Sequence, residues 1–357
     1  MVTVIGWDIG GANTKAAFLR TKNGYVEEIK TAIEYFPVWK QPEKLANVLS
    51  TLKDRVSNRA KLDCIGLTMT AELSDVYQTK REGVNHVLAC AVQAFADIPV
   101  FVLYVDTTMR SIDDARSEPL MVAAANWAAT GWLVAQLIKT CVIIDVGSTS
   151  TSIIPVIGGR VSAAGKTDLE KLMLGELVYT GSLRTNVAAV VRSVPLRDSK
   201  ARVSSELFAQ SGDVHRVLGN ITEDEYTTET ADGRGKTRTE AMARLARVVC
   251  ADIEMLNEEE IVQIARYIYN KQVEQVVEGL NQVYSRVRSL TTAKISVVIT
   301  GLGKDFIAKT AAQRIRIEKI IDLSKLMSND VVAASPAAGV ALMTASKLEG
   351  RTVKWTL

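Results

Sequence analysis

Histidine and cysteine are scarce in this chain of 357 residues. Because only His86 and His215 are present, a catalytic or metal site that needs two or three imidazole groups is nearly excluded. The four cysteines lie far apart, form no CxxC pair and each fall in an apolar run, which predicts buried, reduced thiols inside the cell. They are Cys64, Cys90, Cys141 and Cys250.

The sequence also lacks an excess of charge of one sign. Lys+Arg 43 and Asp+Glu 40 leave a formal net charge of +3, which gives no reason to expect a nucleic-acid partner. No basic segment with a cleavage site opens the chain, so we expect no signal peptide and a cytoplasmic protein. Residues 120–138 carry no charge and are long enough to span a bilayer, but they include Asn126, Thr130 and Gln136, so we predict a buried helix and no membrane contact.

What the sequence does contain is typical of a soluble α/β protein. It is 47% hydrophobic and 23% charged, and its length favours two lobes over one core. Apolar β-branched runs alternate with segments of helical spacing. We predict strands at 2–9, 14–19, 63–70, 99–105, 140–146, 153–157, 294–300 and 316–321. We predict helices at 42–56, 82–95, 120–138, 199–210, 239–256, 258–289 and 335–348, the last with Ser335 as N-cap.

An internal repeat is the most informative pattern. When Asp8 is aligned with Asp145, the small and polar residues that follow each aspartate also align, and both segments lie between two predicted strands. The further aligned pairs are Gly10 with Gly147, Asn13 with Ser150, and Thr14 with Thr151. A single Asp-x-Gly turn is usually structural, but two copies at matching positions, with a third glycine turn at Thr300–Gly303, favour function.

Such a loop can bind phosphate. Glycine lets the backbone approach an anion, successive N–H groups point at its oxygens, and hydroxyl, amide and ammonium groups add donors. We expect Mg²⁺ to be held by Asp8 and Asp145 against a phosphate chain. The predicted phosphate-binding residues are Gly10, Gly11, Asn13, Thr14, Lys15, Gly147, Ser148, Thr149, Thr151, Gly301 and Gly303.

These motifs resemble those of the actin, sugar-kinase and Hsp70 ATPase superfamily. WDIGGANTK and IDVGSTSTS are similar to its two phosphate motifs, ITGLGKDF to its adenosine motif and SPAAGVALM to its closing helix. The resemblance implies two ribonuclease-H-like α/β lobes with a central cleft. The first lobe would comprise residues 1–139 plus 335–357, and the second residues 140–334.

A narrower resemblance is carried by GLTMTAELSD, GELVYTGSLRTNV, TADGRGKT and RLARVVCADIE. These runs are similar to the methanofuran biosynthesis family, which is also found as a tetrahydromethanopterin-linked C1-transfer protein and is related to hydantoinase A and 5-oxoprolinase. That resemblance implies a transferase. An aminomethyl-furanmethanol diphosphate would be joined to the phenol oxygen of γ-glutamyl-tyramine, with release of diphosphate. Mg²⁺ would be required, and ATP, if it binds, would not be consumed.

The general base remains open at this point. Glu72, Asp75 and Asp213 are the candidates, although the first two also suit a helix start and could be surface residues. Arg184, Asp232 and Arg234 are candidates for gripping phosphate or the glutamyl carboxylate, with salt bridges as the alternative. Residues 216–239 would form either a solvated loop or a ligand-gripping loop.

Two alternative functions are also compatible with these residues. One is an ATP-dependent small-molecule kinase or an oxoprolinase-like amidohydrolase, and the other is a nucleotide switch that is not an enzyme. Small-molecule substrates are expected for the transferase and for the ATP-dependent enzyme. A homodimer is possible in each case. Formation of ADP from ATP and Mg²⁺ would favour an ATP-using protein.

Overall fold

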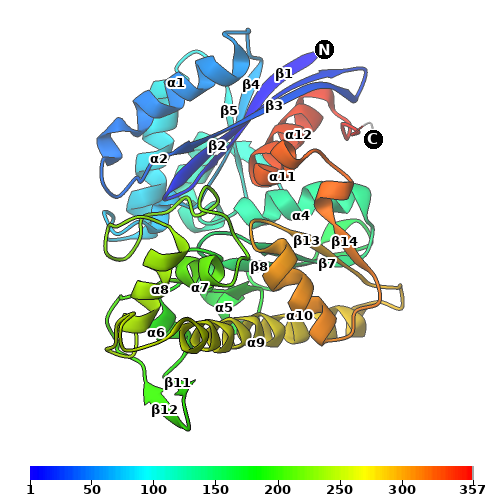
Figure 1. Cartoon of the computed structure of the whole chain (residues 1–357). Coiled ribbons are helices and arrows are strands. Elements are labelled where there is room, and N and C mark those ends of the chain that lie inside the picture. Colours follow the sequence, from blue (N-terminus) through cyan, green and yellow to red (C-terminus); the bar gives the residue numbers. More distant parts are fainter. Residues whose placement is uncertain (356–357) are drawn as a thin grey trace. The chain divides into compact units, whose positions relative to one another are not determined.

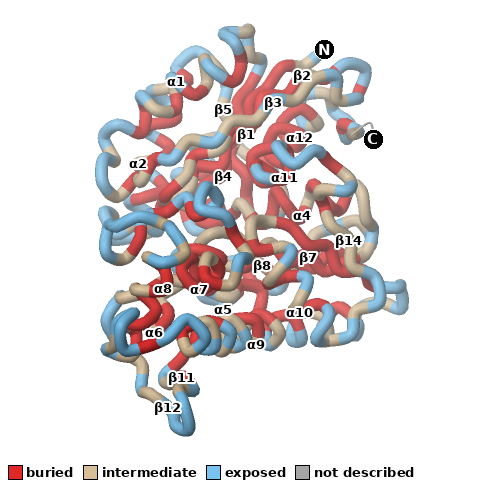
Figure 2. Tube along the Cα trace, viewed as in Figure 1, coloured by how far each residue is buried: buried red, intermediate tan, exposed pale blue. Residues whose placement is uncertain are grey.

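A computed structural model of the chain describes residues 1–355 (Figure 1). By their contacts, the residues separate into two compact units. Unit 1 comprises residues 1–141, 154–171 and those from 323 onward, and unit 2 comprises residues 142–153 and 172–322. The chain forms two larger β-sheets, and the buried residues follow the strands and the helices next to them (Figure 2).

The sheet of unit 1 has six strands in the order β3-β2-β1-β4-β5-β6. The first three strands are antiparallel, while β4 and β5 run parallel to β1. β3 was not predicted because it is an outer strand with no apolar run. The strands are β1 (Val2–Ile9), β2 (Asn13–Lys22), β3 (Tyr25–Tyr35), β4 (Cys64–Met69), β5 (Val100–Leu103) and β6 (Met109–Ser111).

Helices pack on this sheet through two different kinds of surface. Large side chains such as Trp7 and Ile9 form a core with helices α1 (Leu45–Ser57) and α2 (Lys80–Ala94). The contact between β1 and helix α12 instead requires glycine, because a Cβ on Gly6 would lie 2.1 Å from the carbonyl oxygen of Ala337 in α12. The remaining helical segments are η1 (Pro42–Lys44), η2 (Ala71–Leu73), α3 (Ile112–Ser117), η3 (Pro119–Met121), α4 (Asn126–Leu137), η5 (Leu323–Lys325), α11 (Asn329–Ala333) and α12 (Ser335–Glu349).

The second sheet has the strand order β10-β8-β7-β13-β14, with β9 paired to β8. Its longest helical neighbour is α9 (Glu258–Leu290), which begins at a capping box formed by Asn257 and Glu260. The strands are β7 (Cys141–Val146), β8 (Thr151–Ile157), β9 (Arg160–Val161), β10 (Leu177–Val178), β13 (Ser296–Thr300) and β14 (Ile320–Asp322). The other elements are α5 (Asp168–Met173), α6 (Val187–Val190), the hairpin β11 (Ser193–Leu196) and β12 (Ser199–Arg202), α7 (Ser211–Val217), α8 (Arg238–Arg247), η4 (Lys304–Ala308) and α10 (Lys309–Arg314).

The predicted α/β class with two ribonuclease-H-like sheets is confirmed. The uncharged run at 120–138 folds largely as α4, and no helix within residues 1–355 is long and apolar enough to cross a membrane. The N-cap of α12 is Ala334, so Ser335 is its first helical residue rather than its cap.

Four local predictions in the second half were wrong. Residues 199–210 form β12 and an irregular segment instead of a helix, because a turn at Arg197, with φ of +52°, folds the chain back into a hairpin. The helix expected over 239–256 ends at Arg247, and residues 253–255 form a turn. Cys250 has φ of +56° and is exposed, so its thiol is not buried as predicted. Of the strand expected at 316–321, only the last two residues are in a strand, as part of β14.

Candidate functional site

The sequence repeat corresponds to a repeated backbone turn. In the first loop the N–H of Gly10 donates to the carbonyl of Asn13 at 3.0 Å, and in the second the N–H of Gly147 donates to the carbonyl of Ser150, also at 3.0 Å. Each turn joins two strands that are neighbours in a sheet, β1 to β2 and β7 to β8. The two copies therefore share their local geometry as well as their residue types.

Asp8 occupies a buried position at the end of β1. Its exposed fraction is 3%, and its Oδ2 lies 3.9 Å from the Nζ of Lys15, its partner on β2. Burial raises the pKa of Asp8, an effect that Lys15 and Asn126 partly offset. Its Oδ1 and the Oγ1 of Thr68, which pairs with it on β4, have no hydrogen-bond partner among residues 1–355. This pair of oxygens has unused capacity for a ligand.

Glu72 is the second buried carboxylate of unit 1. It lies in η2 directly after β4 and is 1% exposed. Neither of its carboxylate oxygens has a partner in hydrogen-bonding geometry within the part of the chain that is described. Burial raises the pKa of Glu72 to about 7, although Lys80, whose Nζ is 3.9 Å from Oε1, lowers it. Glu72 is therefore a carboxyl group that can exchange a proton near neutral pH.

A single segment borders both carboxylates. The backbone of Ala124 is near Glu72, and the side chain of Asn126 is near Asp8. Ala124 has φ of +50°, a left-handed conformation that costs a non-glycine residue roughly 1–2 kcal/mol. Strain of this kind is concentrated at functional sites, so the start of α4 belongs with Asp8 and Glu72 in the candidate site.

The other predicted bases occupy different surroundings. Asp75 is exposed on the turn after η2. Asp213 is fully buried in unit 2, where its Oδ1 accepts from the Nε of Arg244 at 2.8 Å and from the hydroxyl of Tyr226 at 3.2 Å. Its Oδ2 accepts from the N–H of Gln210 at 2.9 Å. Catalysis by Asp75 or Asp213 stays a prediction, but the contacts of Asp213 favour a structural role.

The loop at 216–239 is tied to α8 rather than freely solvated. Asp232 accepts from Arg244 at 3.1 Å and from Arg247 at 2.9 Å, while the backbone N–H of Arg234 also donates to it, at 3.2 Å. Tyr226, within the same segment, is fully buried. The side chains of Asp232 and Arg234 are thus not paired with each other, and Asp232 is held by the two α8 arginines.

Unit 2 gathers the second loop, the late glycine turn and Arg184. A Cβ on Gly301, which has φ of +85°, would lie 2.7 Å from the Oδ1 of Asp145. The N–H of Gly303 donates to the carbonyl of Val146 at 3.0 Å, and the N–H of Arg184 donates to the carbonyl of Ser148 at 3.0 Å. The hydroxyl of Thr151, in contrast, already donates to the carbonyl of Thr180 at 2.8 Å.

His215 is a structural residue by its contacts. It is fully buried, and its Nε2 lies 2.9 Å from the Oε1 of Gln272, while its Nδ1 lies 3.1 Å from the Nδ2 of Asn220. Burial lowers the pKa of His215 to about 4, so the ring is neutral at physiological pH.

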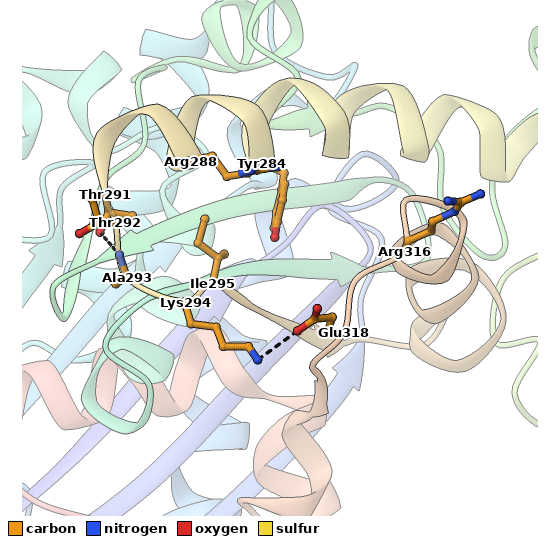
Figure 3. A pocket seen from close by; sticks show the side chains of 9 residues that line it. All are labelled: Tyr284, Arg288, Thr291, Thr292, Ala293, Lys294, Ile295, Arg316 and Glu318. Atoms are coloured by element: carbon orange, nitrogen blue, oxygen red, sulfur yellow. Dashed lines mark hydrogen bonds and ion pairs between the residues drawn. The ribbon is translucent and has the colours of Figure 1, made fainter.

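A surface hollow elsewhere contains none of the predicted site residues. It has a volume of about 560 Å³ and lies at the end of α9 (Figure 3). Lys294 and Glu318 form an ion pair of 3.0 Å in it, and both are exposed.

Sequence reasoning missed several polar neighbours of the two carboxylates. Lys80 and Asp168 form an ion pair of 2.5 Å across 88 positions of sequence, for which no motif exists. Thr68 lies within an apolar strand. Asn126 did carry a signal, since it is a polar amide inside an uncharged run.

With these features in place, comparison with known proteins defines the class. The chain belongs to the hydantoinase/oxoprolinase family, whose model matches residues 63–347. It is 38% identical over 349 residues to the (4-{4-[2-(gamma-L-glutamylamino)ethyl]phenoxymethyl}furan-2-yl)methanamine synthase of Methanocaldococcus jannaschii, covering 98% of this chain and 99% of that protein. The synthase of the same name from Methanococcus vannielii is 32% identical over 215 residues, which are 60% of this chain and 94% of that protein.

These relatives confirm the predicted membership in the methanofuran biosynthesis family. Among solved structures, the ethanolamine utilization protein EutJ from Carboxydothermus hydrogenoformans is 14% identical. It has a TM-score of 0.48 and covers 96% of this chain and 90% of its own.

Proposed function

We propose that this chain is a transferase that forms the aryl ether of a methanofuran precursor. The phenol oxygen of γ-glutamyl-tyramine attacks the methylene carbon of an aminomethyl-furanmethanol diphosphate. The new bond joins that oxygen to the carbon, the bond from the carbon to the diphosphate oxygen breaks with its electron pair, and the phenol proton passes to a base. Diphosphate is the second product.

The observation that carries this proposal is the match along almost the whole chain to a named synthase, at 38% identity. The name of that relative's product contains a phenoxymethyl group on a furan ring, which is the ether in question. A furfuryl carbon ionises readily because the ring oxygen spreads positive charge. The protein therefore mainly has to orient the phenol and stabilise the departing anion.

Glu72 is the base that the geometry favours. A carboxylate with an ordinary pKa is a poor base for a phenol, whereas burial raises the pKa of Glu72 to about 7. No side chain among the described residues hydrogen-bonds to its oxygens in regular geometry, which leaves capacity to accept the phenol proton. In this assignment Glu72 takes the proton that the phenol loses as its oxygen bonds to carbon.

The first loop would hold the diphosphate. Asp8 fits a Mg²⁺ ligand because its Oδ1 is buried and lacks a partner within residues 1–355. No cluster of three or more His, Cys, Asp or Glu residues in that range is arranged to hold a metal ion, so water and phosphate oxygens would complete the shell of Mg²⁺. When bound, Mg²⁺ would neutralise charge on the leaving diphosphate. Lys15 and the backbone N–H groups of the Gly10 loop would orient it.

The proposal is tested by turnover of the two synthetic substrates with Mg²⁺ and without ATP. Mass spectrometry should find the ether, and one diphosphate should appear for each ether formed. Glu72→Gln should lower kcat at least about 100-fold, as expected for loss of a general base. Glu43→Gln, at an exposed position in η1, should retain full activity. Full activity of Glu72→Gln would remove Glu72 from the mechanism, and absence of the ether in the unaltered protein would overturn the reaction.

A further inference from the structure

Lys80 is shared unequally between two carboxylates in unit 1. Its Nζ lies 2.5 Å from Oδ2 of Asp168 and 3.9 Å from Oε1 of Glu72. The shorter distance is a charge-assisted hydrogen bond, while the longer one is beyond hydrogen-bonding range. The Lys80 side chain is one quarter exposed and that of Glu72 is fully buried, so the ammonium group lies between solvent and the buried carboxylate.

The backbone fixes these distances. Helix α2, which begins at Lys80, packs on η2 so closely that a Cβ on Gly83 would lie 2.6 Å from the Cα of Glu72. The N-cap of α2 is Thr79, whose hydroxyl accepts from the N–H of Glu82 at 3.1 Å. Lys80 is thus attached one residue after a capped helix end that is pressed against the residue bearing the buried carboxylate.

Other charged and titratable groups on α2 are directed elsewhere. Arg81 and Glu82 are exposed, and Glu82 accepts from the N–H of Gln78 at 2.8 Å. His86 is bonded to the hydroxyl of Tyr77 at 2.5 Å, and burial lowers its pKa. The charges that act on Glu72 are those of Lys80 and Asp168.

We propose that Lys80 and Asp168 are positioning residues for the buried Glu72 carboxyl group. Asp168 holds the ammonium group of Lys80 away from that carboxyl group, and the pair thereby tunes how readily Glu72 takes up a proton. This inference deepens the proposed function, in which Glu72 is the base. Had Lys80 bonded Glu72 directly, the carboxylate would be held ionised and would be a weaker base. Without any nearby cation, it would stay protonated well above neutral pH.

The two substitutions should therefore act in opposite directions. Lys80→Met removes the cation and should raise the pKa of Glu72 by about one pH unit, an effect typical of a partner at this distance. The ionised fraction at pH 7 then falls from about one half to about one tenth, and kcat/KM at pH 7 falls about five-fold. Asp168→Asn removes a repelling charge and releases Lys80 toward Glu72, so it should lower the pKa. A purely structural ion pair would give both variants the same defect.

The experiment follows the Glu72 carboxyl carbon by NMR in protein labelled with carbon-13 at the glutamate side-chain carboxyl. The resonance is assigned by its loss in Glu72→Gln and titrated from pH 4 to 10. Lys80→Met should move its midpoint up and Asp168→Asn should move it down. Lys80→Arg, which retains the charge, should restore a midpoint within a few tenths of a pH unit, and Arg81→Met, which removes an exposed charge one residue away, should leave it unchanged.

This readout does not depend on turnover. Opposite shifts support the tuning of Glu72 even if the protein makes no ether, in which case only the proposed function fails. Midpoints that stay the same, or move in the same direction in Lys80→Met and Asp168→Asn, would overturn the inference even if the synthase reaction is found. In the active protein, the acidic limb of the kcat/KM profile should move with the NMR midpoint.

Discussion

Replacement of Glu72 by glutamine should make the protein more stable as well as inactive. Burial raises the pKa of Glu72 from 4.5 to about 7, so the folded state holds a proton that the unfolded chain releases at lower pH. Since the folded state binds more protons between these values, the free energy of unfolding falls as pH rises from about 4.5 to 7. Below pH 4.5 the group makes no difference, and above pH 7 its full destabilising effect is present.

The size of the effect follows from the same values. One pH unit corresponds to about 1.4 kcal/mol, so ionised Glu72 destabilises the fold by about 3 kcal/mol at pH 8. Glutamine has the shape of the protonated acid and cannot ionise, so Glu72→Gln should be close to neutral at pH 4 and stabilising by up to about 3 kcal/mol at pH 8. Such an opposition between stability and activity is common at active sites.

Urea unfolding at several pH values measures this difference. The gain in Glu72→Gln should grow between pH 4.5 and 7 and level off above, while Glu43→Gln, at an exposed site, should show no comparable change. A gain that is the same at pH 4 and pH 8, or a loss at pH 8, would refute the reasoning, because it would mean that Glu72 is not a buried acid with a raised pKa.

Three further outcomes are expected. Gly301→Ala should destabilise the fold by more than about 3 kcal/mol, because the new Cβ would lie 2.4 Å from the carbonyl oxygen of Val146 and the residue has φ of +85°. Gly158→Ala is the control, because it has φ of +60° with nothing within 4 Å, and it should cost about 1 kcal/mol. Equal losses of stability in thermal unfolding would contradict the packing of the glycine turn. Asp213→Asn should destabilise by about 3 kcal/mol, because Arg244 loses its buried anion and keeps only the partly exposed Asp232. A change below about 1 kcal/mol in urea unfolding would argue against that role. Asp8→Asn should keep its circular dichroism spectrum but lose ether formation by orders of magnitude and require more Mg²⁺; an unchanged Mg²⁺ requirement would remove Asp8 as a ligand.

The sequence was sufficient for the α/β class and for the repeated loops because both depend on local patterns. Val2–Ile9 and Cys141–Val146 are apolar runs followed by glycine, and such runs fold as buried strands whatever else surrounds them. The long helix Glu258–Leu290 was also foreseen, since its apolar spacing continues over many turns from a strong N-cap.

Predictions were wrong where tertiary contacts override local preference. Strand β3 has little apolar sequence and exists because β2 pairs with it along its whole length. The helix expected over 199–210 was replaced by a hairpin whose turn requires left-handed backbone at Arg197. The charged neighbours of Glu72 could not be predicted from the sequence either, because Lys80 and Asp168 are 88 positions apart and no spacing rule connects them.

The central claim is that a carbon–oxygen ether is made directly from the phenol, with diphosphate as the leaving group. The most direct measurement uses γ-glutamyl-tyramine labelled with oxygen-18 at the phenol, together with the furan diphosphate and Mg²⁺. The account predicts that the label is retained in the ether and that the released diphosphate is unlabelled, with no ATP present. Ether that forms only when ATP is added, or oxygen-18 recovered in phosphate or diphosphate, would contradict it.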